Sequence, residues 1–304
     1  MRLGFSACGI VEAKPVDDDA RRTYQQYIDR GCHASMEYLT RYPSQRFDPS
    51  QLLPGCKTII TLALNYYPIQ LLPADSYQIS YYAYGADYHD VMRSKLRQLV
   101  AAILPYYPSL NYKLAVDTAP VLERYWAVRS GMGWVGKNHT LIVPRQGSYV
   151  FLGEILIDEA IPAATAKTES PCVRTGCGSC QRCIDACPTH ALGADGTFDS
   201  RRCLSYLTIE HRGDFEEEQH RLIAGQPTPY YIYGCDRCQK ACPHNMHAVP
   251  TTQSDFSPHP DLLQMTPDDW HHLSREQYQL LFRHSAVKRA KYEGLIRNIQ
   301  AIQH

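Results

Sequence analysis

Residues 177–188 read Cys-Gly-Ser-Cys-Gln-Arg-Cys-Ile-Asp-Ala-Cys-Pro, and this stretch decides how the rest of the chain is interpreted. Its four cysteines are separated by two, two and three residues, and proline follows the last of them. This is the spacing of the bacterial ferredoxin run, in which three thiolates hold one four-iron cluster and the fourth reaches a second cluster. Zinc sites more often pair two separated doublets of ligands, so the spacing favours iron–sulfur clusters over zinc.

A second run at residues 235–243 reads Cys-Asp-Arg-Cys-Gln-Lys-Ala-Cys-Pro and has one cysteine fewer. The two runs supply seven ligands, whereas two clusters need eight. We predict Cys203 as the eighth ligand, with Cys172 as the alternative. Because the last cysteine of each run serves the other cluster, the expected ligands are Cys177, Cys180, Cys183 and Cys242 for cluster 1, and Cys187, Cys203, Cys235 and Cys238 for cluster 2.

The cysteine distribution and the hydropathy pattern indicate where the chain works. Nine of the twelve cysteines lie between Cys172 and Cys242, which favours reduced, metal-binding thiolates over disulfides. Cys8, Cys32 and Cys56 are distant from both runs and are interpreted as small hydrophobic residues. No segment has the roughly 20 apolar residues that span a bilayer, and the N-terminus does not resemble a secretion signal. We therefore expect a cytoplasmic protein without a membrane partner.

Length and charge set further bounds. At 304 residues the chain exceeds one compact domain, so at least two units are expected. Basic and acidic residues both number 31, giving a formal net charge of zero, so any contact with a polyanion would need a local basic patch.

The pattern outside the cysteine runs predicts an α+β fold in three parts. Strands are expected at 58–65, 112–116, 140–143 and 149–157, with helices at 87–104 and from 117–120 to about 130. This gives a first domain at 1–160 and a ferredoxin-like double-cluster domain at 161–250. A C-terminal helical segment at 251–304 is expected to pack back on the core, with helix starts at Thr266 and Ser274 and one helix from 275 to about 299.

Two adjacent clusters form an electron path, and a path needs an acceptor. More than half of the chain precedes the cysteine runs, so the first domain is expected to hold that acceptor. No Gly-x-Gly-x-x-Gly fingerprint follows a strand there, which leaves a Rossmann-type nicotinamide or flavin site without support.

Several motifs, in order along nearly the whole chain, resemble epoxyqueuosine reductases. They are Arg-Phe-Asp-Pro at 46–49, Tyr-Ala-Tyr-Gly-Ala-Asp-Tyr-His at 82–89, Asp-Thr-Ala-Pro-Val-Leu-Glu-Arg at 117–124, Gly-Trp-Val-Gly-Lys-Asn at 133–138, the first cysteine run, Arg-Cys-Leu-Ser-Tyr-Leu-Thr-Ile-Glu at 202–210 and Tyr-Gly-Cys at 233–235. The resemblance implies a cobalamin held by a nitroreductase-like first domain. It also implies the last step of queuosine synthesis, in which the epoxide at the tRNA wobble position is reduced to an alkene with release of water.

The resemblance also implies site residues. Asp117 matches the proton donor, although the sequence alone also allows a simple helix N-cap. A carboxylic acid that keeps its proton near neutrality would need an apolar, desolvated setting. Asp87, Tyr88 and His89 match polar residues near the corrin, without a histidine ligand to cobalt. Weaker cofactor contacts are Arg41, Ser80, Asn138 and Ser205, and Tyr81 replaces an arginine that is usual in the family.

The implied partners are a tRNA and an electron donor. The tRNAs would be those with GUN anticodons, for Asp, Asn, His and Tyr, and the donor a low-potential flavodoxin or ferredoxin; a monomer is expected. Basic residues near the C-terminus and after Asp199 are the candidate tRNA contacts, with a merely solvated helix face as the alternative. They are Arg202, Arg212, Arg283, Lys288, Arg289, Lys291 and Arg297, with Arg201 beside them.

Two rival functions share some of these features. One is a corrinoid iron–sulfur reductase that acts on a small molecule, as reductive dehalogenases do. The other is a non-enzymatic ferredoxin-type electron carrier, which would bind clusters and no corrin.

Overall fold

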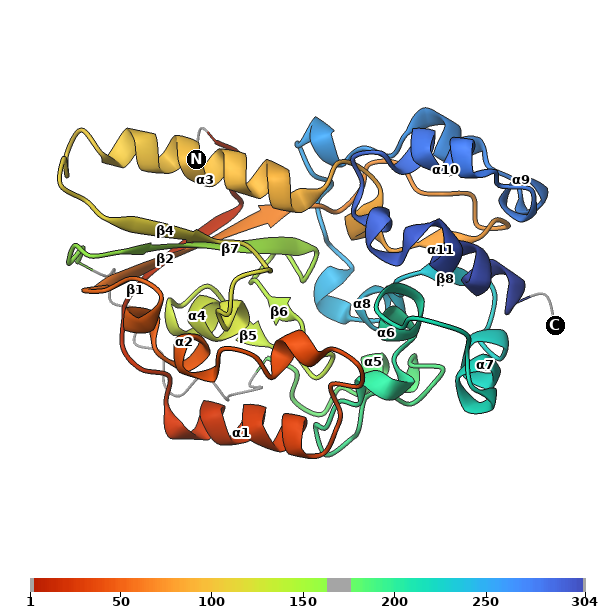
Figure 1. Cartoon of the computed structure of the whole chain (residues 1–304), viewed down its shortest axis with the longest axis horizontal. Coiled ribbons are helices and arrows are strands. Elements are labelled where there is room, and N and C mark those ends of the chain that lie inside the picture. Colours follow the sequence, from red (N-terminus) through yellow and green to blue (C-terminus); the bar gives the residue numbers. More distant parts are fainter. Residues whose placement is uncertain (1–2, 163–175, 303–304) are drawn as a thin grey trace.

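A four-stranded antiparallel sheet forms the centre of the first half of the chain (Figure 1). The structure is a computed structural model that describes residues 3–162 and 176–302. The strand order is β1-β2-β7-β4. The strands are β1 (Ala7–Glu12), β2 (Thr58–Asn65), β7 (Val150–Ile157) and β4 (Tyr112–Ala115).

Helices cover both faces of this sheet because both faces are apolar. On β7, Phe151, Ile155 and Ile157 belong to the main core with α3 (Tyr88–Ile103), and a Cβ added at Gly153 would lie 2.9 Å from Met92 of α3. The alternate residues of β7 face α4 (Glu123–Arg129), where Leu156 packs with Trp126. Residue 154 therefore lies on the α4 face.

Short helices and loops surround the sheet and carry the cysteine runs. The remaining elements of this part are α1 (Asp18–Asp29), α2 (Pro43–Phe47), β5 (Trp134–Val135), β6 (Leu141–Ile142), α5 (Arg182–Asp185), α6 (Leu204–Ile209), α7 (Glu217–Ala224) and α8 (Arg237–Lys240). Helices α5 and α8, one from each run, pack against each other.

One apolar core connects the parts that the sequence separates. Strand β3 (Gln78–Ile79) lies outside the four-stranded sheet and pairs in parallel with β8 (Tyr231–Tyr233), which immediately precedes the second cysteine run. The main core contains Leu64, Ile232 and Phe282, one from each of the three predicted segments.

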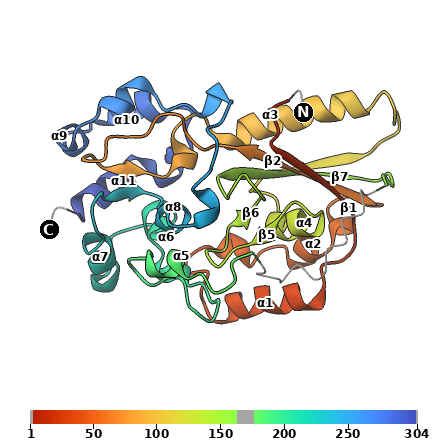
Figure 2. The same ribbon diagram turned by 180° about the vertical axis from the view of Figure 1, so that it is seen from behind.

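The C-terminal segment begins as predicted and then breaks. Helices α9 (Pro267–His271) and α10 (Arg275–Phe282) start at capping boxes on Thr266 and Ser274. The prediction of one helix from 275 to 299 is wrong. A 3-10 helix, η8 (Ala286–Ala290), follows α10, and Lys291 has φ of 61° where α11 (Lys291–Gln300) begins. Helix α11 packs against α6 and β8, and Figure 2 shows it beside α6. Among the described residues no helix is long and apolar enough to cross a membrane.

Candidate active site and cluster sites

The described cysteines of the two runs, with Cys203, fall into two groups. The Cys183 thiol is near enough to those of Cys177, Cys180 and Cys242 to interact electrostatically with each. The Cys238 thiol interacts in the same way with a second set, Cys187, Cys203 and Cys235. The fold therefore brings the last cysteine of each run to the other run. Cys172 lies outside the described residues.

Backbone N–H groups point at several of these sulfurs. Ala191 N–H donates to Cys187 Sγ at 3.3 Å. The Cys203 sulfur accepts from the backbone of Ser205 and Tyr206. Such hydrogen bonds stabilise thiolates and tune the potential of a cluster. Ser205, predicted as a cofactor contact, thus supports a cysteine through its backbone.

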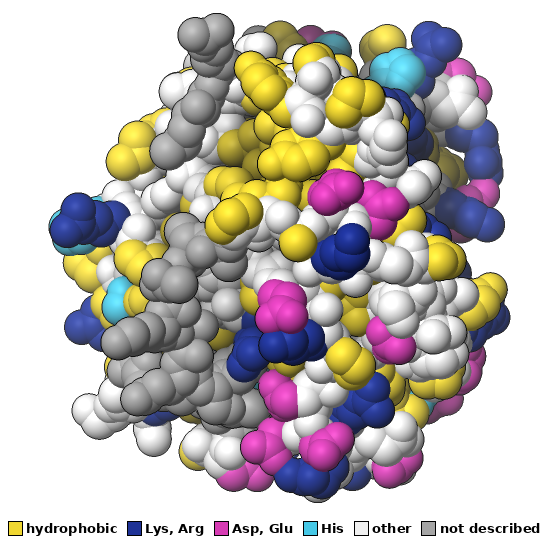
Figure 3. All heavy atoms as spheres, turned by 90° about the vertical axis from the view of Figure 1, so that its left-hand side faces the viewer, with side chains coloured by type: hydrophobic (Ala, Val, Ile, Leu, Met, Phe, Trp, Pro, Cys, Tyr) yellow, Lys and Arg dark blue, Asp and Glu magenta, His cyan; other side chains and the backbone are white. Residues whose placement is uncertain are grey.

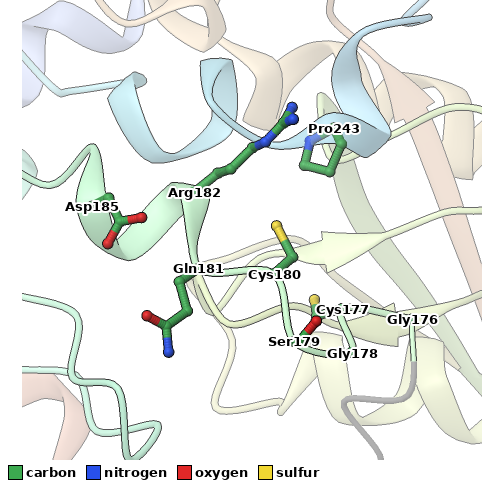
Figure 4. A pocket seen from close by; sticks show the side chains of 9 residues that line it. All are labelled: Gly176, Cys177, Gly178, Ser179, Cys180, Gln181, Arg182, Asp185 and Pro243. Carbon is green, nitrogen blue, oxygen red and sulfur yellow. The ribbon is translucent and has the colours of Figure 1, made fainter.

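The first group lies beside an open hollow of about 590 Å³. Its lining includes Cys177, Cys180 and Pro243, and in Figure 4 the Cys180 side chain extends toward Pro243. Lys137, in the motif at 133–138, donates to the carbonyls of Gly178 and Cys180, both at 2.9 Å, and so connects this motif to the first cysteine run. In the described part of the chain no three Cys, His, Asp or Glu side chains are arranged to hold a single metal ion. A four-iron cluster is larger and spreads its ligands farther apart.

Asp117 occupies an unusual backbone position. It follows β4 with φ of 53°, in the left-handed region, and its side chain is 59% exposed. The N-cap interpretation is wrong, because α4 begins only at Glu123 and the residue before it, Leu122, makes no side-chain cap. A left-handed non-glycine residue is uncommon and often marks a functional site.

His89 joins Asp117 to a second carboxylate. Its Nε2 lies 3.2 Å from Asp117 Oδ2, and its Nδ1 lies 2.7 Å from Asp87 Oδ1. Asp87 is also the N-cap of α3, accepting from the His89 N–H, and the Tyr88 hydroxyl bonds Asp117. The start of α3 thus brings the predicted residues 87–89 together with Asp117 at the end of β4.

The charges of this group differ from the sequence expectation. Desolvation raises the pKa of Asp117, but hydrogen bonds from His89 and Tyr88 outweigh it, and the pKa lies below its usual value. Desolvation lowers the pKa of His89, yet hydrogen bonds to Asp117 and Asp87 raise it to about 9. The proton near neutrality therefore resides on the imidazole between two carboxylates.

Two glutamates that the sequence analysis did not single out lie behind Asp117. Glu123 Oε1 accepts the Asp117 backbone N–H at 2.5 Å. Glu154, on the face of β7 that packs against α4, is fully buried, and neither of its carboxylate oxygens has a partner. A lone acidic residue inside the apolar strand 149–157 was the one signal that could have identified Glu154.

The other predicted cofactor contacts are scattered. Asn138 is buried; its Oδ1 accepts from Thr140, while its Nδ2 has no partner. Ser80 is buried, with its hydroxyl bonded to Asp236 next to Cys235. Arg41 is exposed on the loop before α2.

Some of the predicted tRNA contacts are hydrogen-bonded or paired within the protein, and others have exposed side chains. Arg297 donates to the carbonyls of Leu207 and Gly213, and burial lowers its pKa to about 10. Arg202, Arg212 and Arg289 are bonded to Glu218, to the Ile209 carbonyl and to Glu210 respectively. The side chains of Arg283, Lys288 and Lys291 are exposed.

Lys288 and Arg289 lie on η8 beside the Asp87–His89–Asp117 group. Lys288 Nζ is 3.8 Å from Asp87 Oδ2, and Arg289 lies near enough to Asp117 to lower its pKa. By contrast, the face at the far end of the sheet shows Lys and Arg interspersed with Asp and Glu (Figure 3).

Comparisons with known proteins agree in both halves of the chain. The family description "Epoxyqueuosine reductase QueG, DUF1730" matches residues 46–118, and "4Fe-4S double cluster binding domain" matches residues 176–245. The epoxyqueuosine reductase of Cellulophaga algicola is 37% identical over 303 residues, covering 100% of this chain and 95% of that protein. The Escherichia coli enzyme is 37% identical over 311 residues, covering 98% and 77%.

Solved structures give the same result. An epoxyqueuosine reductase determined with a tRNA-Tyr epoxyqueuosine-modified stem loop superposes with a TM-score of 0.85 at 27% identity, covering 99% of this chain and 78% of that one. The Bacillus subtilis enzyme, captured with its catalytic aspartate loop swung out of the active site, gives a TM-score of 0.85 at 26% identity and the same coverage.

A double-cluster module joined to an α/β unit with an acidic site makes this chain an iron–sulfur oxidoreductase. The relatives identify the kind. The chain belongs to the epoxyqueuosine reductase family, and the resemblance seen in its motifs is confirmed.

Proposed function

We propose that this protein reduces epoxyqueuosine to queuosine at the wobble position of tRNA, the last step of queuosine synthesis. The observation that carries the proposal is the Asp87–His89–Asp117 chain of hydrogen bonds in a molecule that also gathers eight cysteines into two groups. The reaction converts an epoxide to an alkene and water, and it consumes two electrons and two protons. The reaction needs both a proton donor, as the Asp87–His89–Asp117 group can provide, and an electron path, as two clusters on the cysteines would provide.

The two groups of thiols are the proposed cluster sites, divided as the sequence predicted. Four thiols, with backbone N–H groups directed at their sulfurs, are the donor set that a four-iron cluster requires. When bound, the clusters supply single electrons at low potential. Cys203 is the proposed eighth ligand because its thiol interacts with those of Cys187, Cys235 and Cys238.

The first domain is the proposed cobalamin-binding unit, with a nitroreductase-like fold at 1–160, a ferredoxin-like domain at 161–250 and a helical segment at 251–304. The residues present fit a large polar ligand: the buried Nδ2 of Asn138 lacks a partner, and the Asp117 side chain is 59% exposed. Asp87, Tyr88, His89 and Asn138 would contact it. When bound, cobalamin supplies a low-valent cobalt centre for two-electron reduction.

The proposed proton donor is Asp117 acting with His89. In this structure Asp117 carries the negative charge and His89 the proton, and a distance of 3.2 Å lets the proton move between them. As the carbon–oxygen bond breaks, the oxygen becomes basic and takes this proton. Asp87 holds the opposite side of the imidazole and so fixes its orientation.

Replacing His89 with Gln should change how stability depends on pH. The folded state raises the His89 pKa from 6.5 to about 9, so the His89 imidazole binds its proton more tightly in the folded chain than in the unfolded chain. This stabilisation is complete below about pH 6.5 and is lost as pH rises through about 9. Urea unfolding from pH 6 to 10 should show this loss in the wild type and not in His89→Gln. His272→Gln, at an exposed His–Asp pair, is the control, and equal curves for wild type and His89→Gln would contradict the assignment.

The exposed lysines near the active site are the proposed tRNA contacts. Lys288 and Lys291 have exposed side chains, and Lys288 Nζ approaches Asp87 Oδ2 only to 3.8 Å, whereas the Arg297 guanidinium is hydrogen-bonded within the protein. Exposed lysines can turn toward a phosphate. The double variant Lys288→Ala, Lys291→Ala should weaken binding of an anticodon stem loop several-fold. It should also reduce the salt slope of log K by about 2.

Fluorescence anisotropy at several salt concentrations measures both effects. Lys14→Ala is the matched control, because Lys14 is an exposed lysine that pairs with Glu12 just after β1. An unchanged salt slope in the double variant would remove these two lysines from the interface.

The rival functions differ in what the protein binds. Anaerobic titration with cobalamin, followed by visible spectroscopy, should show corrin binding, and the stem loop should bind the same protein. A carrier would bind no corrin, and a small-molecule reductase would bind corrin and turn over organohalides without affinity for the stem loop. A tRNA substrate also accords with a cytoplasmic location and with a flavodoxin- or ferredoxin-type donor. The monomeric state stays a prediction.

A further inference from the structure

The loop that carries Asp117 is anchored in the core at both ends and exposed between them. Val116, which precedes Asp117, is 2% exposed and belongs to the main core. Ala119 and Leu122, which follow it, pack against the core on the α4 side of the sheet. Asp117 and Thr118, between these anchors, are exposed. Apolar packing therefore does not fix these two residues, and polar contacts must do so.

Asp117 needs such contacts because its backbone is strained. Its φ of 53° lies in the left-handed region, which is unfavourable for a residue that has a side chain. Such a conformation persists only where the surrounding structure enforces it. If the loop relaxed to an ordinary φ, the Asp117 carboxylate would turn away from His89, whose Nε2 lies 3.2 Å from Asp117 Oδ2.

Two side chains hold these exposed residues from opposite faces of the sheet. From α3, Arg93 Nη2 donates to Thr118 Oγ1 at 2.8 Å. From the start of α4, Glu123 Oε1 accepts the Asp117 backbone N–H at 2.5 Å. Figure 1 shows α3 and α4 on opposite sides of the sheet. Arg93 lies one turn after His89, so one face of α3 contacts both Asp117 and Thr118.

We propose that Arg93 and Glu123 are positioning residues, which keep Asp117 in the left-handed conformation in which its carboxylate meets His89. Arg93 acts through the Thr118 side chain, and Glu123 acts through the Asp117 backbone. Neither contact uses the Asp117 carboxylate, which stays available to His89 and to a substrate. The catalytic consequence rests on the proposed function, because it assumes that Asp117 and His89 deliver the proton.

The pKa of His89 reports the position of Asp117 without relying on activity. Burial lowers the His89 pKa, but hydrogen bonds to Asp117 and Asp87 raise it to about 9. NMR titration of the His89 imidazole in the oxidised holoenzyme should therefore give a lower pKa in Arg93→Leu and in Glu123→Ala than in the wild type. In both variants Asp117 moves away from the imidazole, and Asp87 alone remains.

Matched variants separate displacement of Asp117 from a simple change of charge. Loss of the Arg93 charge without movement of Asp117 would raise the His89 pKa, because a nearby positive charge disfavours the protonated imidazole. Arg97→Leu removes an equal charge from an exposed position one turn further along α3 and should not lower the pKa. Glu123→Gln removes the negative charge but keeps an oxygen that can accept the Asp117 N–H, so its His89 pKa should stay higher than that of Glu123→Ala.

Thr118→Val, at an exposed position, is the second variant for the Arg93 contact, because it removes the hydroxyl that accepts from Arg93. It should lower the His89 pKa as Arg93→Leu does, and it serves if Arg93→Leu does not fold. A His89 pKa of about 9 in Glu123→Ala, or in both Arg93→Leu and Thr118→Val, overturns the proposal.

Turnover then separates positioning from binding. Arg93→Leu and Glu123→Ala should lower kcat by about 10-fold to 100-fold, because a displaced acid is lost from its working position, while KM for the stem loop stays near the wild-type value. Glu123→Gln should recover most of the kcat that Glu123→Ala loses. A raised KM with wild-type kcat in Arg93→Leu would mean that Arg93 binds the substrate directly, which overturns its positioning role. Failure of the proposed function is visible separately, as absence of epoxyqueuosine reduction in the wild type, whereas the His89 titration still reports the position of Asp117.

Discussion

Replacing Asp117 with Asn should abolish nearly all turnover while the protein stays folded. Asparagine has the same shape, tolerates the left-handed backbone at this position, and still accepts a hydrogen bond from His89. It cannot carry the proton that, in the proposed reaction, passes to the departing oxygen. Loss of a general acid costs about 10²–10⁴-fold in rate, so anaerobic turnover of epoxyqueuosine in an anticodon stem loop should fall by that amount.

The control is the integrity of the holoenzyme. Cluster absorbance, cobalamin binding and stem-loop affinity should stay at wild-type values in Asp117→Asn, because the side chain makes no contact with the cysteine groups among the interactions described. Wild-type turnover in this variant would remove Asp117 as the acid and leave His89 as the remaining donor.

Replacing Cys203 with Ser should remove one cluster and with it the electron path. Its thiol interacts with Cys187 and is hydrogen-bonded by the backbone of Ser205 and Tyr206, so it completes the second group. Iron should fall from about eight to about four atoms per chain, and turnover with a chemical reductant should be lost. Metal analysis and low-temperature electron paramagnetic resonance measure the loss directly.

Two other cysteines are the matched controls for this experiment. Cys32 is buried, its sulfur lies 4.0 Å from the Arg30 carbonyl, and none of the interactions that define the two groups involves it. Cys32→Ser and Cys172→Ser should both keep all the iron. If Cys172→Ser loses a cluster and Cys203→Ser does not, the ligand set must be exchanged.

Sequence patterns predicted the parts of the fold that depend on local chemistry. The strand expected at 58–65 is β2 with the same bounds, and the helix expected at 87–104 is α3, shorter by one residue at each end. Capping boxes at Thr266 and Ser274 start helices as expected. Strict apolar patterns and side-chain caps are signals contained within a few residues, so no tertiary information is needed to read them.

The missed features depend on contacts between distant residues. The helix predicted through 275–299 breaks at η8, where Ser285 donates to the Ala83 carbonyl at 3.0 Å. The parallel pairing of β3 with β8 joins residues about 150 positions apart and could not be seen in either segment. Periodicity does not report such contacts.

The candidate site divides in the same way. Family motifs located Asp117 and residues 87–89, and the structure places them in one hydrogen-bonded group. The ionisation of that group was not predictable, because His89 and Asp117 are 28 residues apart and meet only in the fold. The expected apolar setting for Asp117 is replaced by two hydrogen-bond donors, which favour its charged form.

The most direct test of the account is the mass of the modified nucleoside after turnover. Anaerobically prepared protein, loaded with iron, sulfide and cobalamin, is incubated with a reductant and epoxyqueuosine-bearing tRNA, which is then digested to nucleosides. The epoxyqueuosine peak should be replaced by one lighter by a single oxygen atom. An unchanged epoxyqueuosine peak from protein that carries both clusters and cobalamin would contradict it.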